Sequence, residues 1–292
     1  MTDAPIAVVG LGSMGYGIAN SALAAGLPVH GHDVNPDQAK RFLADGGIPG
    51  PLARIAPDLA AAVIVVLNAA QTESVLFGEA ALVPHMARGS VVVACATVSP
   101  AFARSMEVRC REHGVLYLDA PISGGAVKAA QGALSVMASG VPEAFARAKP
   151  VLDAIAERVF RLGDAAGAGS AMKAVNQLLA GVHIAAMAEA MTFGMTQGVT
   201  PEAFMEVIPQ CAGTSWMLEN RGRMWSRATT PPGPASTSGP RTWASSSTSR
   251  GGRASARRSP PRRCSSSSPQ PGRAWARWTM RPSRGSMRAT RG

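Results

Sequence analysis

Lys173 and Asn176 carry side chains that could bind or react with a small organic substrate, and their spacing brings the two together. They are three residues apart in a helical pattern, so both lie on one helix face. The neighbours of Lys173 are apolar, and from there to Met195 only His183 and Glu189 can ionise. A lysine in so apolar a helix needs a partner or a cavity, and burial lowers its pKa toward that of a usable base. Because a lone helix lysine is usually a surface residue, the residues alone leave both interpretations open.

Ser123, Gly124 and Gly125 form a second candidate, in the run Asp119-Ala-Pro-Ile-Ser-Gly-Gly that follows a predicted strand. The run presents a hydroxyl beside two small residues whose backbone N–H groups are accessible, and such donors can hold a carboxylate. Ser-Gly-Gly runs are more often simple turns. By itself this motif therefore indicates either a turn or an anion-binding loop.

A glycine-rich turn near the start of the chain, Gly10-Leu11-Gly12-Ser13-Met14-Gly15, follows an apolar strand and opens a helix. The first glycine permits the tight turn, the second lets the backbone approach a pyrophosphate, and the third lets helix and strand pack closely. The free N–H groups at the helix start face the anion. In this context the motif predicts a dinucleotide-binding site.

Asp33 ends the second predicted strand, 18 residues after Gly15. A carboxylate there accepts hydrogen bonds from the ribose hydroxyls and repels a 2′-phosphate, which favours NAD over NADP. His32 and Asn35 do not supply the arginine that an NADP pocket usually has. The competing interpretation is a glycine-rich turn with a solvated aspartate.

Two kinds of pattern follow one another along the chain, and they predict its elements. Short β-branched runs predict a sheet of six or more strands at residues 6–9, 29–33, 63–67, 91–95, 116–118 and 134–138. Helices alternate with them at residues 14–25, after Asn35-Pro36 and after Ser99-Pro100. Only helices follow, at residues 170–197 and from Thr200-Pro201. The fold class is therefore α/β, a doubly wound sheet followed by an all-α part.

The formal net charge of +11 comes from the end of the chain. Residues 227–292 hold 14 Arg, 14 Ser and 9 Pro without Asp, Glu or Lys, whereas the first 226 residues carry 15 basic and 18 acidic groups. This segment also contains no Leu, Ile, Val or Phe, so it cannot offset its ordering entropy by burial and is expected to be disordered. The predicted division is residues 1–165 for cofactor binding, 166–226 for a truncated all-α domain, and 227–292 for a non-globular tail.

Cysteine usage and hydropathy predict a reduced cytoplasmic chain. The four cysteines are widely scattered without a C-x-x-C pair, and the N-terminal residues lack the features of a signal peptide. The longest apolar stretch, residues 178–195, is interrupted by His183 and Glu189, which favours a buried helix over a membrane span.

Three motifs together resemble one family. G-L-G-S-M-G at residues 10–15, D-A-P-I-S-G-G at 119–125 and G-A-G-S-A-M-K-A-V-N at 167–176 are similar, in order and spacing, to the β-hydroxyacid dehydrogenases, the relatives of 3-hydroxyisobutyrate dehydrogenase. The resemblance spans residues 6–226. Residues 66–78 are further similar to the branch that acts on four-carbon sugar acids, the L-threonate dehydrogenases.

This resemblance implies a Rossmann domain joined by a long helix to an all-α domain, with NAD and substrate in the cleft between them. The working form it implies is a homodimer or homotetramer, without a membrane, nucleic acid or metal. Lys173 matches the family's catalytic lysine and Asn176 its substrate-binding asparagine. The carboxylate-binding loop is matched by Ser123, Gly124 and Gly125.

On the cofactor side, the resemblance adds two residues to the glycine-rich turn and Asp33. Thr97 matches a cofactor-contacting threonine, and Asn68 lies where the family's loop borders the cofactor. Asp119 is expected to order its loop rather than to take part in the chemistry.

The implied activity is NAD-dependent oxidation of a small hydroxy acid, in first place L-threonate to its 2-oxo acid. Oxidation of 3-hydroxyisobutyrate or another 3-hydroxy acid is the alternative within this class. A different class is an inactive nucleotide-binding protein whose basic arm binds nucleic acid through phosphates. Against it, the only aromatic residues of the arm are Trp243, Trp275 and Trp278, whose spacing does not suit base stacking.

The chain departs from the family at its end, where the family continues with a helix bearing K-D-L-G. Residues 229–244, shifted by one base, are compatible with D-Y-T-P-R-S-G-V-D-I-W-A-K-D-L-G, and the final glycine is forced by Trp243-Ala244. A reading-frame slip, an arginine-rich arm and a plain tail are the three explanations. As written, the chain is expected to lack several helices and one wall of the cleft, and therefore to be poorly stable and weakly active or inactive.

Sequencing the coding DNA across residues 220–250 tests the slip. We expect one base too many or too few, because the shifted frame restores K-D-L-G at the family's position. An intact frame would instead establish the arginine-rich segment as part of the protein.

Overall fold

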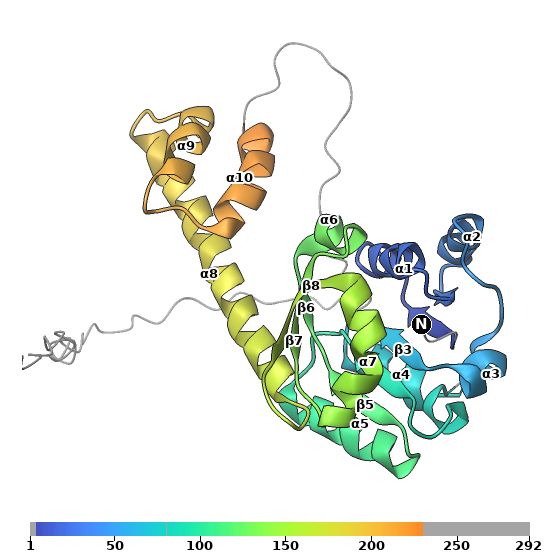
Figure 1. Cartoon of the computed structure of the whole chain (residues 1–292). Helices are drawn as coiled ribbons and strands as arrows, with labels where there is room; N and C mark the ends of the chain where they lie inside the picture. Colours follow the sequence, from blue (N-terminus) through green and yellow to red (C-terminus); the bar gives the residue numbers. More distant parts are fainter. Residues whose placement is uncertain (1–3, 80, 230–292) are drawn as a thin grey trace, which may run out of the picture. The chain divides into compact units, whose positions relative to one another are not determined.

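The β-branched runs near the N-terminus form a parallel sheet, as their alternation with helices predicts (Figure 1). The computed structural model describes residues 4–79 and 81–229. Its first sheet has the order β2-β1-β3-β4-β5, and every pairing in it is parallel. The bounds, in that order, are Val29–His32, Ile6–Val9, Ala61–Ile64, Val91–Ala94 and Leu116–Asp119. The strand order reverses between β1 and β3, which is where a doubly wound sheet opens a crevice for a ligand.

Helices cover both faces of this sheet, because successive strand residues point to opposite sides. Val8 and Val63 share one buried cluster with α1 (Gly15–Ala24) and α7 (Pro142–Ile155). Ala62 and Ile64 share the other with α4 (Ala69–Phe77) and α5 (Pro100–Glu112). The remaining helices on this part of the chain are α2 (Pro36–Ala44), α3 (Leu52–Ile55) and α6 (Gly125–Ala130).

The prediction of one sheet with six or more strands is wrong. A separate three-stranded sheet contains β6 (Ile122–Ser123), β7 (Leu134–Ala138) and β8 (Ala156–Arg161), with β7 in the centre. Pro121 has no N–H group to continue the ladder beyond β5, and the chain after it pairs antiparallel with β7. A single bridge, between Asp119 and Ser139, joins the two sheets. The run that forms β8, Ala-Glu-Arg-Val-Phe-Arg, carries too many charges to be recognised as a strand.

The predicted all-α part contains α8 (Ala168–Thr196), α9 (Pro201–Val207) and α10 (Trp216–Thr229). The start of α9 is as predicted, with the Thr200 hydroxyl accepting a hydrogen bond from the Ala203 N–H at 3.2 Å. A small apolar core joins the three helices through Met187, Met191, Phe204, Met205 and Leu218. Helix α10 continues to Thr229, past the predicted boundary at residue 226. The rest of the predicted tail, residues 230–292, lies outside the described residues.

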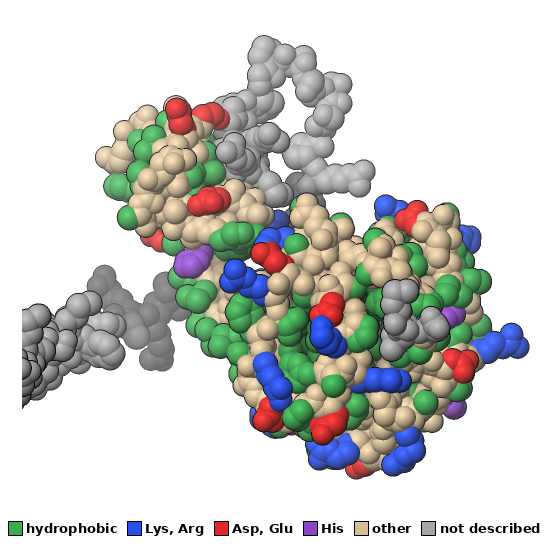
Figure 2. Space-filling view, in the orientation of Figure 1, with side chains coloured by type: hydrophobic (Ala, Val, Ile, Leu, Met, Phe, Trp, Pro, Cys, Tyr) green, Lys and Arg blue, Asp and Glu red, His purple; other side chains and the backbone are tan. Residues whose placement is uncertain are grey.

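Helix α8 exists as predicted, but it is not buried along most of its length. Its large apolar side chains Val175, Leu178, Leu179 and Val182 are all more than half exposed. Figure 2 shows hydrophobic side chains at the surface in this region. Its start packs on β5, β7 and α5, and its second half packs on α9 and α10. Within residues 4–79 and 81–229 it is the one helix long and apolar enough to cross a membrane, a test that core helices of soluble proteins also pass.

The glycine-rich turn packs against its surroundings as its sequence predicts. Gly10 has φ +96°, and a Cβ atom there would lie 2.3 Å from the Val65 carbonyl oxygen. A Cβ atom on Gly15 would lie 1.8 Å from the Gly10 carbonyl oxygen. At Gly12, by contrast, a Cβ atom would meet nothing within 4 Å. Gly10 and Gly15 therefore serve the close packing of the turn, whereas Gly12 faces open space.

Gly15→Ala is expected to lower the free energy of unfolding by about 3 kcal/mol, because the new methyl group collides with rigid backbone. Gly12→Ala, three residues away in the same turn, is the matched control and should change it by less than about 0.5 kcal/mol. Urea unfolding followed by circular dichroism measures both. Equal losses in the two variants would contradict this account of the turn.

Candidate functional site

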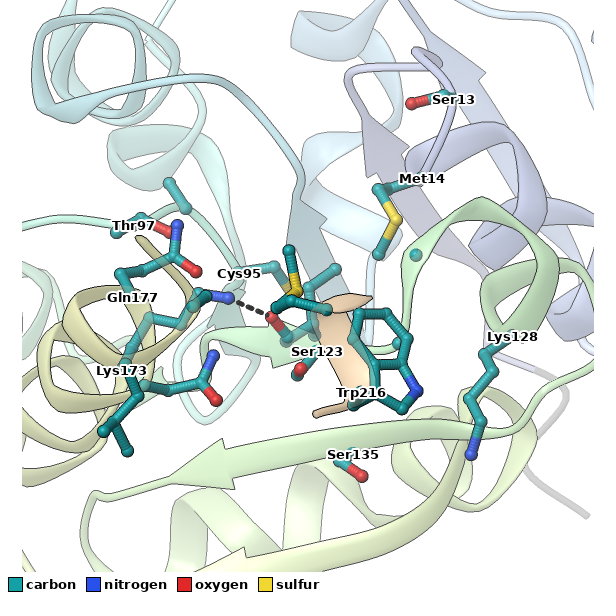
Figure 3. Close-up of a pocket in the computed structure, with 18 of the residues that line it drawn as sticks. Ser13, Met14, Cys95, Thr97, Ser123, Lys128, Ser135, Lys173, Gln177 and Trp216 are labelled. Atoms are coloured by element: carbon teal, nitrogen blue, oxygen red, sulfur yellow. Dashed lines mark hydrogen bonds between the residues drawn. The ribbon is translucent and has the colours of Figure 1, made fainter. Parts of the chain in front are cut away.

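A cavity of about 860 Å³ opens between the glycine-rich turn, the loop after β5, the inner face of α8 and the start of α10. All of the described residues belong to one structural unit, and every wall of the cavity lies within that unit. Ten of the predicted site residues line the cavity: Gly12, Ser13, Met14, Gly15, Thr97, Ser123, Gly124, Gly125, Lys173 and Asn176. Figure 3 shows Ser13, Met14, Thr97, Ser123 and Lys173 converging on one space.

The wall formed by the glycine-rich turn fits a dinucleotide. Helix α1 begins without a side-chain cap; the Tyr16 N–H donates to the Gly12 carbonyl oxygen at 2.9 Å, and the N–H groups of the turn from Gly12 to Gly15 are available to an anion. The open space at Gly12 lets a phosphate approach the backbone closely. These features are what a bound pyrophosphate requires.

Four predicted cofactor residues lie outside the cavity lining, namely Gly10, Leu11, Asp33 and Asn68. Asp33 lies beside the turn, since its carboxylate accepts hydrogen bonds from the Leu11 N–H at 2.6 Å and the Asn35 N–H at 2.8 Å. Each oxygen keeps a second lone pair, so ribose hydroxyls can still bind there. The Asn68 side chain caps α4 by accepting a hydrogen bond from the Gln71 N–H at 3.0 Å.

Asp119 connects the first sheet to the start of α8. It is only 1% exposed, and its Oδ2 atom accepts hydrogen bonds from the N–H groups of Gly167 and Ser170, both at 2.9 Å. Its Oδ1 atom accepts from the Ser170 hydroxyl at 2.7 Å. Ser139 supplements it by accepting from the Gly169 N–H at 2.9 Å. Asp119 therefore does more than order its own loop: it caps a helix that begins about 50 residues later in the sequence.

Glycine at position 169 allows this junction to close. A Cβ atom there would lie 2.4 Å from the Met137 carbonyl oxygen and 2.7 Å from the Asp119 carbonyl oxygen. The first turn of α8 thus packs directly on the backbone of β5 and β7. This contact determines where the following turn of the helix, with Lys173, must lie.

Lys173 is buried, with 8% of its surface exposed. Its ammonium group donates a hydrogen bond to the Ile122 carbonyl oxygen at 2.8 Å, next to Ser123 (Figure 3). No carboxylate pairs with it in the part of the chain that the structure describes. Burial therefore lowers the pKa of Lys173 below its usual value of 10.5, with no counter-ion to oppose the shift.

Ser123 ends strand β6, and two glycines follow it at the cavity wall. Gly124 has φ +137° and Gly125 φ +77°, conformations that side chains rarely adopt. The two glycines lead into α6, so the hydroxyl of Ser123 and backbone N–H groups are near one another at the cavity wall. Such a set of donors can hold a carboxylate.

The cavity lining also contains polar residues that the sequence analysis did not single out: Lys128, Ser135, Gln177, His183, Thr214, Ser215, Trp216 and Arg221. Gln177 could have been found, since it is four residues after Lys173 on the same helix face. His183 is on the same helix and Lys128 lies three residues after Gly125, whereas the remaining residues come from separate segments and carry no local signal. The lining includes three basic side chains and no aspartate or glutamate, so the described cavity favours an anionic ligand.

Comparisons with known proteins agree with this geometry. The NAD binding domain of 6-phosphogluconate dehydrogenase matches residues 5–163. The family described as NAD-binding of NADP-dependent 3-hydroxyisobutyrate dehydrogenase matches residues 167–236.

Individual relatives cover most of the chain. L-threonate dehydrogenase from Cupriavidus necator is 50% identical over 74% of this chain and 73% of its own length. The enzyme of the same name from Pectobacterium atrosepticum is 46% identical over 76% and 74%. A crystal structure of 3-hydroxyisobutyrate dehydrogenase from Salmonella typhimurium superposes with a TM-score of 0.74 and 45% identity, covering 79% of this chain and 81% of that one.

The doubly wound sheet and the open glycine-rich turn, with the dehydrogenases to which the chain is similar, define an oxidoreductase that uses NAD and acts on CH–OH groups. Together with the matches above, they show that the chain belongs to the β-hydroxyacid dehydrogenase family. It is an NAD-dependent hydroxy acid dehydrogenase.

Asp119→Asn is expected to lower the free energy of unfolding by about 3 kcal/mol, because an amide NH₂ group cannot accept the hydrogen bonds of the α8 N-terminus. Asp153→Asn on the exposed surface of α7 is the matched control and should cost less than about 1 kcal/mol. Urea unfolding of both variants measures the difference. Similar stabilities would show that the cap contributes little.

Proposed function

We propose that the chain oxidises L-threonate at its C2 hydroxyl to the 2-oxo acid. The observation that carries the proposal is the buried Lys173 beside the Ser123 loop, for which residues 4–79 and 81–229 supply neither a counter-ion nor a carboxylate in the cavity lining. The substrate is inferred from the relatives named L-threonate dehydrogenase, two of which are 46% and 50% identical to this chain.

In this proposal the substrate carboxylate binds to the Ser123 hydroxyl and the N–H groups of Gly124 and Gly125. Neutral Lys173 takes the proton of the C2 hydroxyl through Nζ, while the C–H bond at C2 gives up its electron pair as hydride and a C=O bond forms. NAD, when bound, supplies the acceptor of that hydride. The resulting ammonium group of Lys173 donates to the new carbonyl oxygen, and Asn176 orients Lys173 or a substrate hydroxyl.

A 3-hydroxy acid is the second candidate. The observation in its favour is the similarity to the Salmonella structure, which is named 3-hydroxyisobutyrate dehydrogenase and is 45% identical. A panel of L-threonate, 3-hydroxyisobutyrate and L-serine with NAD separates the two candidates by their kcat/KM values.

Two further expectations accompany this function. The homodimer or homotetramer that the resemblance implies stays a prediction, and so does residence in the cytoplasm. The exposed apolar side chains of α8 form a surface that such an assembly would bury.

Lys173→Ala is expected to lower kcat by a factor of about 10² to 10⁴ while leaving the affinity for NADH within about twofold. The side chain handles the substrate proton and is not part of the glycine-rich turn that holds the cofactor. Lys149→Ala on the exposed face of α7 is the control and should retain full activity. Turnover at the wild-type rate in Lys173→Ala would contradict the proposal.

The pH dependence gives a second test. Only the neutral amine can accept the hydroxyl proton, so kcat/KM should rise with pH through the pKa of Lys173 and fall off below it. Because burial lowers that pKa, the rise should be centred below pH 10.5. A steady-state profile in wild type, set against the residual rate of Lys173→Ala, measures it. A rise of the same shape in both proteins would assign the titration to another group.

A further inference from the structure

The outer part of the glycine-rich turn has little packing to hold it in place. Gly12 and Ser13 are exposed, and a Cβ atom on Gly12 would meet nothing within 4 Å. Leu11, directly before them, is fully buried in the core cluster that includes β1 and α1. The N–H groups that face an anion therefore take their position from the two ends of the turn, Leu11 and Gly15.

Two hydrogen bonds hold the end of the turn at Leu11. The Gly10 N–H donates to the His32 carbonyl oxygen at 2.7 Å, and the Leu11 N–H donates to Oδ2 of Asp33 at 2.6 Å. The first bond uses only backbone atoms, so any residue at position 32 can form it. The second requires an acceptor on the side chain of residue 33, and among residues 4–79 and 81–229 Asp33 is the only recorded partner of the Leu11 N–H.

The carboxylate of Asp33 is itself oriented by the start of α2. Its Oδ1 atom accepts a hydrogen bond from the Asn35 N–H at 2.8 Å, and the Asn35 side chain caps α2 by accepting from the Asp37 N–H at 3.0 Å. The two carboxylate oxygens are thus held by backbone donors on different segments. One side chain thereby joins the glycine-rich turn, the end of β2 and the N-terminus of α2.

Losing this carboxylate would leave the Leu11 N–H without an acceptor, next to a buried side chain. An unpaired N–H group is unfavourable there, so the backbone would shift until the group reached water. Gly12 offers no steric resistance to such a shift, because the space around it is open. The free N–H groups from Gly12 to Gly15 would then no longer be arranged around one anion.

We propose that Asp33 is a positioning residue for the pyrophosphate group, because it holds the glycine-rich turn in its anion-binding shape through the Leu11 N–H. This role is separate from a contact with the adenosine ribose, and it does not depend on which hydroxy acid the chain oxidises. A carboxylate at this position has two opposite effects on an anion at the turn. Its negative charge repels the phosphate, whereas its hydrogen bond arranges the donors that bind the phosphate.

The test uses a ligand that carries a phosphate but has no adenosine half. Reduced nicotinamide mononucleotide, NMNH, is such a ligand, and the fluorescence of its nicotinamide ring gives its Kd by titration without turnover. NADH is titrated in the same way. The proteins are the full chain, its Asp33→Ala and Asp33→Asn variants, and Asp37→Ala as the matched control. Asp37 is exposed in the first turn of α2, so its replacement removes a nearby charge but leaves the hydrogen bond to Leu11 in place.

We expect Asp33→Ala to weaken NMNH binding about tenfold, because the loss of a charge-assisted hydrogen bond outweighs the loss of repulsion. Asp33→Asn keeps one acceptor oxygen for the Leu11 N–H, so NMNH binding should return to within about threefold of the wild type. NADH binding should stay weaker in both variants, since the ribose loses an acceptor. Asp37→Ala should change neither affinity by more than about twofold.

Three results would overturn the inference. Unchanged or tighter NMNH binding in Asp33→Ala would mean that the carboxylate serves the ribose alone. Equal losses in Asp33→Ala and Asp33→Asn would mean that the acceptor for Leu11 is not what matters. A wild-type chain that does not bind NMNH would show that the turn does not hold a phosphate by itself.

Circular dichroism establishes that each variant is folded before it is titrated. If Asp33→Ala does not fold, Asp33→Ser takes its place with the same expected loss of NMNH binding. The serine hydroxyl is one bond closer to the backbone than a carboxylate oxygen, so it falls short of the Leu11 N–H while it can still accept from the Asn35 N–H.

Discussion

The hydrogen bonds between the carboxylate of Asp119 and the N-terminus of α8 determine how the rest of the site is built. Asp119 is the last residue of β5, so its backbone belongs to the parallel sheet. Its side chain accepts from Gly167 and Ser170 at the start of the helix. A buried carboxylate requires such donors, and a helix N-terminus requires such acceptors, so each satisfies the other. This interaction fixes the position of the helix that carries Lys173 relative to the sheet that holds the cofactor.

The electrostatic character of the cavity follows from that arrangement. The Lys173 side chain lies between α8 and β6, where its ammonium group donates a hydrogen bond to the Ile122 carbonyl oxygen. Burial lowers its pKa and so favours its neutral form. The donors around it are backbone N–H groups, hydroxyls and further basic side chains. The described lining therefore favours an anionic ligand, and the acid–base role proposed for Lys173 would use a pKa that burial lowers. The same features that make the site unfavourable for a cation make it suitable for oxidising a hydroxy acid.

The exposed side of α8 reveals a second constraint on this fold. Val175, Leu178, Leu179 and Val182 form an apolar face that no described residue covers. The sequence after residue 226 has no Leu, Ile, Val or Phe, so it lacks the side chains with which a covering helix would be built. Shifted by one base, residues 229–244 are compatible with a string of globular composition. The composition favours the frame slip, and the uncovered face is a surface that a restored helix or the predicted assembly would bury.

The local features of this protein could be derived from its sequence because each depends on neighbouring residues. The turn at Gly10, Gly12 and Gly15 follows from steric limits within a few residues, and the helix from Ala168 to Thr196 follows from its periodicity. Lys173 is a candidate catalytic residue from the sequence because its own neighbours along the chain are apolar. The tertiary structure decided what depends on residues far apart in the chain. It placed β6, β7 and β8 in a separate sheet, gave Asp119 a helix to cap, and left the apolar residues in the middle of α8, from Val175 to Val182, exposed. It also turned Gln177 toward the space that Lys173 and Ser123 share. Such contacts depend on how distant segments pack, and no pattern within one segment of the sequence records the identity of its neighbours in space.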